Sequence, residues 1–74
     1  METLYGTPTE IEINGDKYTL QSEDHKDQVF YHVTKGGEEL CVLSMSEEGV
    51  WEANCDIDEN LVRAIGEQIE RKEI

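Results

Sequence analysis

Three residues that could bind a metal through nitrogen or sulfur, His32, Cys41 and Cys55, fall in segments with strand character. If Gly36-Gly37 closes a tight hairpin, His32 lies opposite Cys41, and Cys55 joins them when the next turn contains a bulge. An imidazole and two thiolates suit zinc. The paired Cys-x-x-Cys spacing of structural zinc sites is absent and no fourth ligand is evident. We therefore predict no bound metal or cofactor and interpret the cysteines as small buried apolar residues.

Carboxylates are concentrated in one segment that contains no Lys or Arg. Six of them fall within thirteen residues: Glu47, Glu48, Glu52, Asp56, Asp58 and Glu59. Asp56, Asp58 and Asn60, with Glu67 further on, approach the spacing of a calcium-binding loop, but Leu61 occupies the position of the turn-forming glycine. Helix capping explains the same residues without an ion. The segment is thus either a solvated rim or a docking surface for a basic protein.

Composition limits the classes of function. The 74 residues suffice for one domain, and 18 Asp and Glu against 6 Lys and Arg give a formal charge of -12. Binding to DNA, RNA or anionic membranes through phosphates needs a positive surface, so we do not expect it. Phosphate-binding loops and recognisable catalytic motifs are absent from the sequence, and a strongly negative field disfavours a reactive thiolate. We expect a protein that is not an enzyme.

The N-terminus and the cysteine count bear on location. The first residues lack the basic start and apolar run of a signal peptide, and no segment is long enough to span a bilayer. Two cysteines are fewer than a secreted disulfide framework needs. The sequence therefore predicts a cytoplasmic protein with both thiols reduced.

The segment from 28 to 45 organises the rest of the chain. Its arms are rich in β-branched, aromatic and aliphatic residues, and Gly36-Gly37 can adopt the positive φ of a two-residue turn. This turn predicts that Val33 faces Leu40 on one face, and that Phe30 faces Leu43 on the other with Met45 beyond. Both faces are apolar, which indicates a central hairpin.

The flanking segments predict one more hairpin, a fifth strand and a helix. Residues 10–21 form an outer hairpin around Asn14-Gly15, with a turn of either two or four residues, and 50–55 form a strand that carries Trp51. From 56 to 74 apolar residues recur every fourth position, as in an amphipathic helix, with Asp56 and Glu59 as a capping box. Gly66 lies beside the apolar stripe, where a close approach to the sheet would explain it.

These elements predict one α+β domain: an antiparallel sheet of about five strands, mostly a meander, with the helix packed on one face. Residues 1–9 are a loose lead-in in which Leu4 and Tyr5 can add an edge pairing, 10–55 form the sheet and 56–74 the helix. The expected core is Ile11, Tyr18, Leu20, Tyr31, Val33, Leu40, Val42, Trp51, Leu61, Ile65 and Ile69.

We expect a non-catalytic protein-interaction or accessory domain. Its partner is a protein of basic character that binds the acidic segment, an uncovered apolar face formed by Phe30, Leu43 and Met45, or both. The same bare face would allow a homodimer. One alternative is an acidic inhibitor that imitates the charge of nucleic acid, and another is a small metal-binding module at His32 and Cys41.

Overall fold

The computed structural model describes residues 4–72. Residues 1–3 of the predicted lead-in and 73–74 of the predicted helix lie outside this range. Within it the elements are β1 (Leu4–Tyr5), β2 (Thr9–Ile13), β3 (Asp16–Asp24), β4 (Val29–Lys35), β5 (Glu38–Met45), β6 (Trp51–Ala53) and α1 (Glu59–Lys72).

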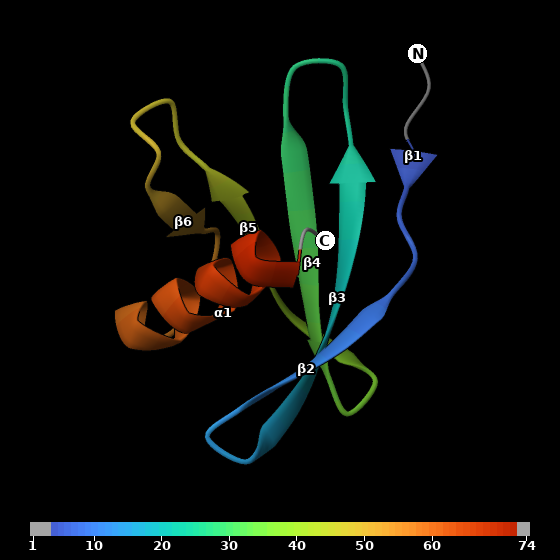
Figure 1. Ribbon diagram of the computed structural model, residues 1–74, viewed down its shortest axis with the longest axis vertical. Helices are drawn as coiled ribbons and strands as arrows, with labels where there is room; N and C mark the ends of the chain where they lie inside the picture. Colours follow the sequence, from blue (N-terminus) through green and yellow to red (C-terminus); the bar gives the residue numbers. More distant parts are fainter. Residues whose placement is uncertain (1–3, 73–74) are drawn as a thin grey trace.

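The strands of the described chain form one antiparallel sheet, and the helix crosses one of its faces (Figure 1). Strands β2 to β6 follow each other as a meander, and β1 pairs with the end of β3 that β2 leaves open. The predicted α+β class with a C-terminal helix is confirmed, as is the edge pairing of Leu4 and Tyr5. The ends of β3 and β4 extend beyond the helix (Figure 1).

The Gly36-Gly37 turn has two residues, as predicted, and the Asn14-Gly15 turn is the two-residue alternative. Asn14 and Gly15 have φ values of 52° and 85°, and Gly36 and Gly37 of 61° and 85°, as the hairpin turns that match strand twist require. Ile11 therefore pairs with Tyr18, as the two-residue turn requires.

The predicted register between β4 and β5 is wrong by one residue beyond the turn. Thr34 pairs with Glu39, but Val33 pairs with Cys41, so Leu40 is an extra residue in a β-bulge. The bulge shifts the remaining pairs, which brings His32 opposite Val42 instead of Cys41.

The bulge also changes the core. Leu40 is 39% exposed, and Val42 is only half-buried on the face that carries His32, so neither occupies the predicted core position. Cys41 and Leu43 are buried in their place. The buried hydrophobic residues of the described chain are Ile11, Tyr18, Leu20, Val33, Cys41, Leu43, Val62, Ile65 and Ile69, with Tyr31, Trp51 and Leu61 packed against them.

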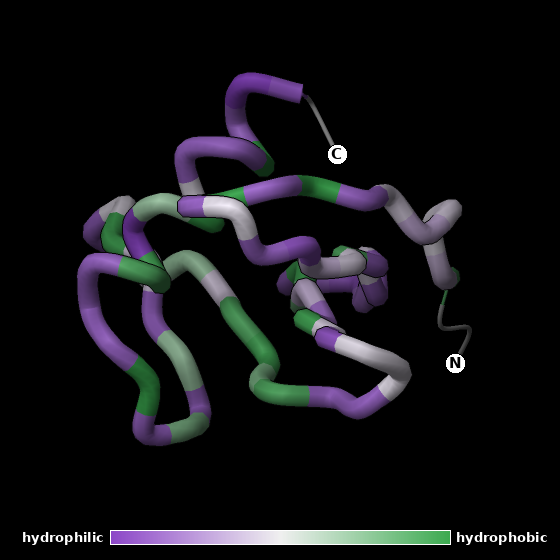
Figure 2. Tube along the Cα trace, turned by 90° about the horizontal axis from the view of Figure 1, so that it is seen from below, coloured by the Kyte–Doolittle hydropathy of each residue, from purple (hydrophilic) through white to green (hydrophobic). Residues whose placement is uncertain are grey.

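The helix begins later than predicted. Asp58 caps it: its side chain accepts a bond from the backbone N–H of Asn60 at 2.8 Å, and its carbonyl oxygen accepts from Val62 at 3.1 Å. The predicted capping box at Asp56 and Glu59 is therefore wrong. Most of the helix trace is hydrophilic (Figure 2), and its buried positions face the sheet.

Cys41 and Cys55 form a disulfide with a Cα–Cα distance of 5.6 Å. The prediction of two reduced thiols is wrong for this structure. Ala53 pairs with Leu43, so the same register places Cys55 opposite Cys41, which is the bulged alternative for the preceding turn. The disulfide ties the segment that leads into the helix to the centre of β5.

Candidate functional site

A groove of about 670 Å³ lies between β6 and the first half of α1. Ala53, Ile57 and Val62 give it an apolar floor, and Val50, which is 55% exposed, stands at its margin. Its lining residues are Gly49, Val50, Trp51, Glu52, Ala53, Cys55, Ile57, Glu59, Val62 and Arg63.

Strand β6 is the last strand of the sheet on this side. The carbonyl oxygen of Val50 accepts a bond from Ser46 at 2.8 Å, and the N–H of Asn54 donates to Val42 at 3.1 Å. Backbone groups point to alternate sides along a strand, so those of Trp51 and Ala53 point away from β5. The strand thus carries a backbone edge with bonding groups directed outward.

Trp51 connects the groove to the core. A Cβ atom on Gly66 would lie 2.4 Å from Trp51 Cδ1, so the absence of a side chain lets the indole pack directly on the helix. The indole also meets the ring of Tyr31 edge-on at a centroid distance of 5.6 Å. The predicted close approach at Gly66 is confirmed, and it fixes the distance between β6 and α1.

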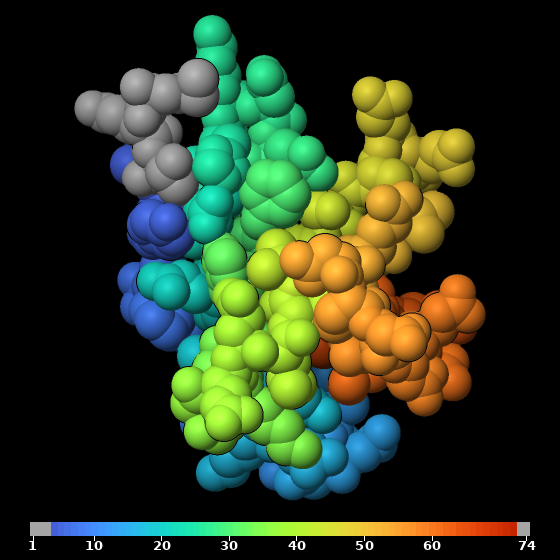
Figure 3. All heavy atoms as spheres, turned by 180° about the vertical axis from the view of Figure 1, so that it is seen from behind, coloured from blue at the N-terminus to red at the C-terminus, as the bar shows by residue number. Residues whose placement is uncertain are grey.

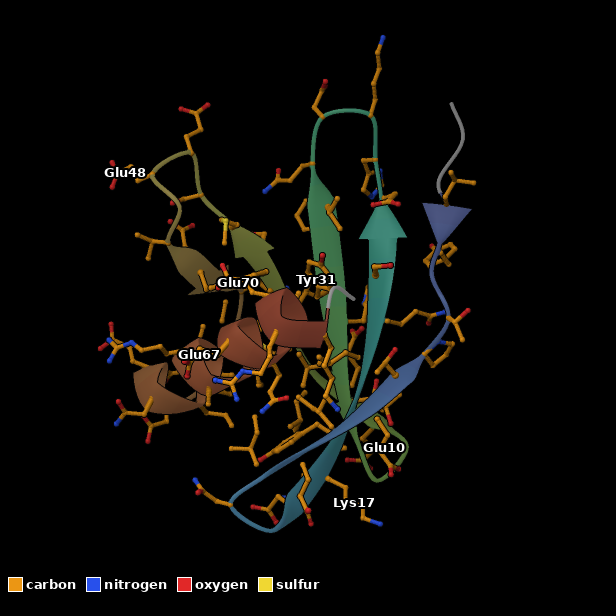
Figure 4. The ribbon with its side chains drawn as sticks, in the orientation of Figure 1. Glu10, Lys17, Tyr31, Glu48, Glu67 and Glu70 are labelled. Carbon is orange, nitrogen blue, oxygen red and sulfur yellow. A yellow bond between two sulfur atoms is a disulfide. The ribbon has the colours of Figure 1, made fainter. Side chains whose placement is uncertain are left out.

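The six carboxylates of the predicted acidic surface are all exposed. Glu52 and Glu59 line the groove, and Asp58 caps the helix beside it. The loop between β5 and β6 projects from the body of the molecule (Figure 3), and Glu48 lies at its tip (Figure 4). Among residues 4–72, Arg63 is the only basic residue that lines the groove. We call this region, the β6–α1 groove with the six carboxylates around it, the acidic groove.

The predicted apolar face is not formed. Leu43 is fully buried on the helix side of the sheet, whereas Phe30 pairs with Ser44 and Glu23 on the opposite side. Met45 is 36% exposed beside Trp51. The bulge moved Leu43 to the core face, so Phe30, Leu43 and Met45 do not form one bare patch.

A network of imidazole and carboxylate groups lies on the sheet face that the helix does not cover, which we call the open face. His32 Nε2 lies 2.6 Å from Glu23 Oε1, His32 Nδ1 contacts Glu39, and the other oxygen of Glu23 contacts His25. Both ring nitrogens of His32 face carboxylates, which suits the imidazolium form because it donates from both.

These contacts shift two pKa values in opposite directions. The hydrogen bond that His32 donates to Glu23, and then the one it donates to Glu39, raises the pKa of His32, while desolvation opposes the shift. The bond to His32, and then that to His25, lowers the pKa of Glu23. The network was not predicted from the sequence. It depends on the pairing of β3 with β4, which places Gln21 opposite His32 and Glu23 two residues further along the same face of β3.

The two residues of the metal-binding alternative, His32 and Cys41, are not placed to share a metal ion. His32 lies on the other sheet face from Cys41, and the sulfur of Cys41 is bonded to Cys55. Within residues 4–72, no group of three or more His, Cys, Asp or Glu side chains is arranged to hold a metal ion.

A second groove, of about 690 Å³, lies between the β3–β4 loop and the end of the helix. It carries Lys26, Val29 and Glu70 among its lining residues, so acidic and basic groups are mixed there. The acidic groove differs from this second groove because negatively charged side chains are concentrated around it.

Protein-family models, curated proteins and solved structures give no match to this chain. In the part of the chain that the structure describes, no helix combines the length and the hydropathy needed to cross a membrane.

Proposed function

We propose that this chain is a non-catalytic interaction domain that binds a basic segment of another protein at the acidic groove. The observation that supports it is the exposure of all six carboxylates around a groove with an apolar floor. Carboxylates attract Lys and Arg, and the floor supplies apolar area that a bound segment can bury. The two features together favour a protein ligand.

The charge of the whole chain supports the same proposal. A formal charge of -12 steers cationic partners toward the molecule and repels phosphate backbones. Screening acts over about 8 Å at physiological salt, so carboxylates gathered at one groove act together at short range.

Capture of partners by tagged protein tests the proposal, with charge reversals as matched variants. Glu47→Lys with Glu48→Lys alters the acidic groove, whereas Glu10→Lys with Glu12→Lys makes the same charge change on β2, far from Glu48 (Figure 4). We expect the unaltered protein to capture a partner that Glu47→Lys with Glu48→Lys no longer captures and that Glu10→Lys with Glu12→Lys still captures. In about 0.5 M salt, where screening is strong, the unaltered protein should also lose this partner. Equal loss in both variants would contradict the proposal, because net charge alone would then explain capture.

The cellular compartment of the protein determines whether the disulfide persists. The sequence favours the cytoplasm, where thiols are kept reduced, whereas an oxidising compartment would keep Cys41 and Cys55 bonded. The redox state of protein trapped with a thiol-alkylating reagent in its own cells distinguishes these locations. The nucleic-acid-mimic alternative stays a prediction, tested by whether DNA competes for the same captured partner.

A further inference from the structure

We propose that the acidic groove binds an extended peptide that pairs with β6 as an added strand and alternates basic with apolar side chains. This inference rests on the proposed function and names the conformation and chemistry of the partner segment.

The outer edge of β6 presents backbone groups with which an extended peptide can pair. The N–H and C=O groups of Trp51 and Ala53 point away from β5, because the flanking Val50 and Asn54 make the bonds toward that strand. An extended chain laid along this edge satisfies those groups with its own backbone, as in strand addition to other sheets.

The two faces of the sheet beside β6 determine how the side chains of the peptide alternate. On an added strand, successive side chains point to opposite faces of the sheet. Those on the helix side meet the floor formed by Ala53, Ile57 and Val62, which takes apolar groups. Those on the other side lie beside Glu52, which pairs with Ser44 on the open face, and a cation there makes a favourable cross-strand pair.

Charge favours a foreign basic peptide over a second copy of this chain. Pairing of two β6 edges would bring the Glu52 side chains of both copies together, and like charges on adjacent strands are unfavourable. Each copy would also bring a formal charge of -12 to the contact. A basic peptide reverses the sign of both interactions.

A titration with synthetic heptapeptides, followed through the amide NMR signals of the full chain, tests the inference. The probe alternates lysine and valine. One comparison peptide replaces lysine by glutamate. The other keeps the side chains but carries an N-methyl group on every internal backbone nitrogen, because N–H groups alternate between the two edges of a strand and all donors that face β6 must be removed.

We expect the lysine–valine peptide to shift the amide signals of Trp51 and Ala53 and the glutamate peptide to leave them unchanged. The N-methylated peptide should bind at least about fivefold more weakly, the size expected for loss of a backbone bond. Ala53→Pro should weaken binding in the same way, because it removes an N–H that points away from β5 and leaves the β5–β6 bonds in place.

The outcomes distinguish the two proposals. If the N-methylated peptide binds as well as its parent and Glu47→Lys with Glu48→Lys abolishes binding, strand addition is wrong and acidic docking stands. If no lysine-containing peptide shifts signals around the acidic groove, both are contradicted. Should Ala53→Pro unfold the domain, the N-methylated peptide still decides, because it uses the unaltered protein.

Discussion

Single residues set the distance between helix and sheet. Gly66 lies against the indole of Trp51, and a methyl group there would lie 2.4 Å from Cδ1. Trp51 lines the acidic groove as well, so this contact determines both the stability of the domain and the width of the groove.

Gly66→Ala should therefore destabilise the domain although alanine is the better helix former. Overpacking costs about 1–3 kcal/mol, which exceeds the helix-propensity gain of about 1 kcal/mol in most of that range. Chemical denaturation measures the effect, with Glu67→Ala as a control on the exposed side of the same turn. An increase in stability for Gly66→Ala would show that the indole can move aside.

The pKa of His32 on the open face is a second property that can be tested at the level of single residues. Since the contacts with Glu23 and Glu39 raise the pKa of His32, its imidazole should titrate above about 6.5. A raised pKa in the folded state means stability that is present below the unfolded pKa and lost as pH rises through the folded one. The lowered pKa of Glu23 means stability that is present above its unfolded pKa of about 4.3 and lost as pH falls.

The network should thus stabilise the domain most between about pH 5 and 6.5. NMR titration of His32 in the unaltered protein and in Glu23→Gln measures this, and the substitution should lower the pKa of His32. A His32 pKa that does not change on Glu23→Gln would contradict the assignment of its main cause.

At the scale of elements, the disulfide links β5 to the segment before the helix. It closes a loop of sequence separation 14, and cross-links of that length stabilise by about 3 kcal/mol. Reduction should lower the melting temperature by about 10–20 °C for a domain of this size. Cys41→Ala with Cys55→Ala should reproduce the effect without a reductant, and equal melting of reduced and oxidised protein would contradict it.

Turn chemistry and periodicity made most elements predictable. Asn14-Gly15 and Gly36-Gly37 need positive φ, and the four-residue recurrence of apolar side chains indicates a helix. The bulge at Leu40 was not predictable, because nothing in its local sequence distinguishes it from a regular strand residue. That one residue places Cys41 and Leu43 on the opposite face of the sheet from the one predicted, so the predicted apolar face does not form.

The site was predictable only in part for a related reason. The acidic run is visible in the sequence, but the groove depends on how β6 and α1 pack, which Gly66 and Trp51 decide together. The pairing of Glu23 with His32 depends likewise on the register of two strands joined by a loop.

At the scale of the whole molecule, charge opposes compactness. A formal charge of -12 on a chain of 74 residues produces self-repulsion that salt screens. Raising NaCl from about 0.01 to about 0.5 M shortens the screening length from about 30 Å to a few ångströms and should raise the melting temperature. A melting temperature that falls with salt would mean that attractive ion pairs outweigh the repulsion.

Hydrogen–deuterium exchange of the domain, alone and with its captured partner, tests the central claim most directly. We expect slower exchange in residues 50–55 and in the first turn of α1, and no change in β2. Protection confined to β1, β2 or the open face would place the partner elsewhere and contradict binding at the acidic groove.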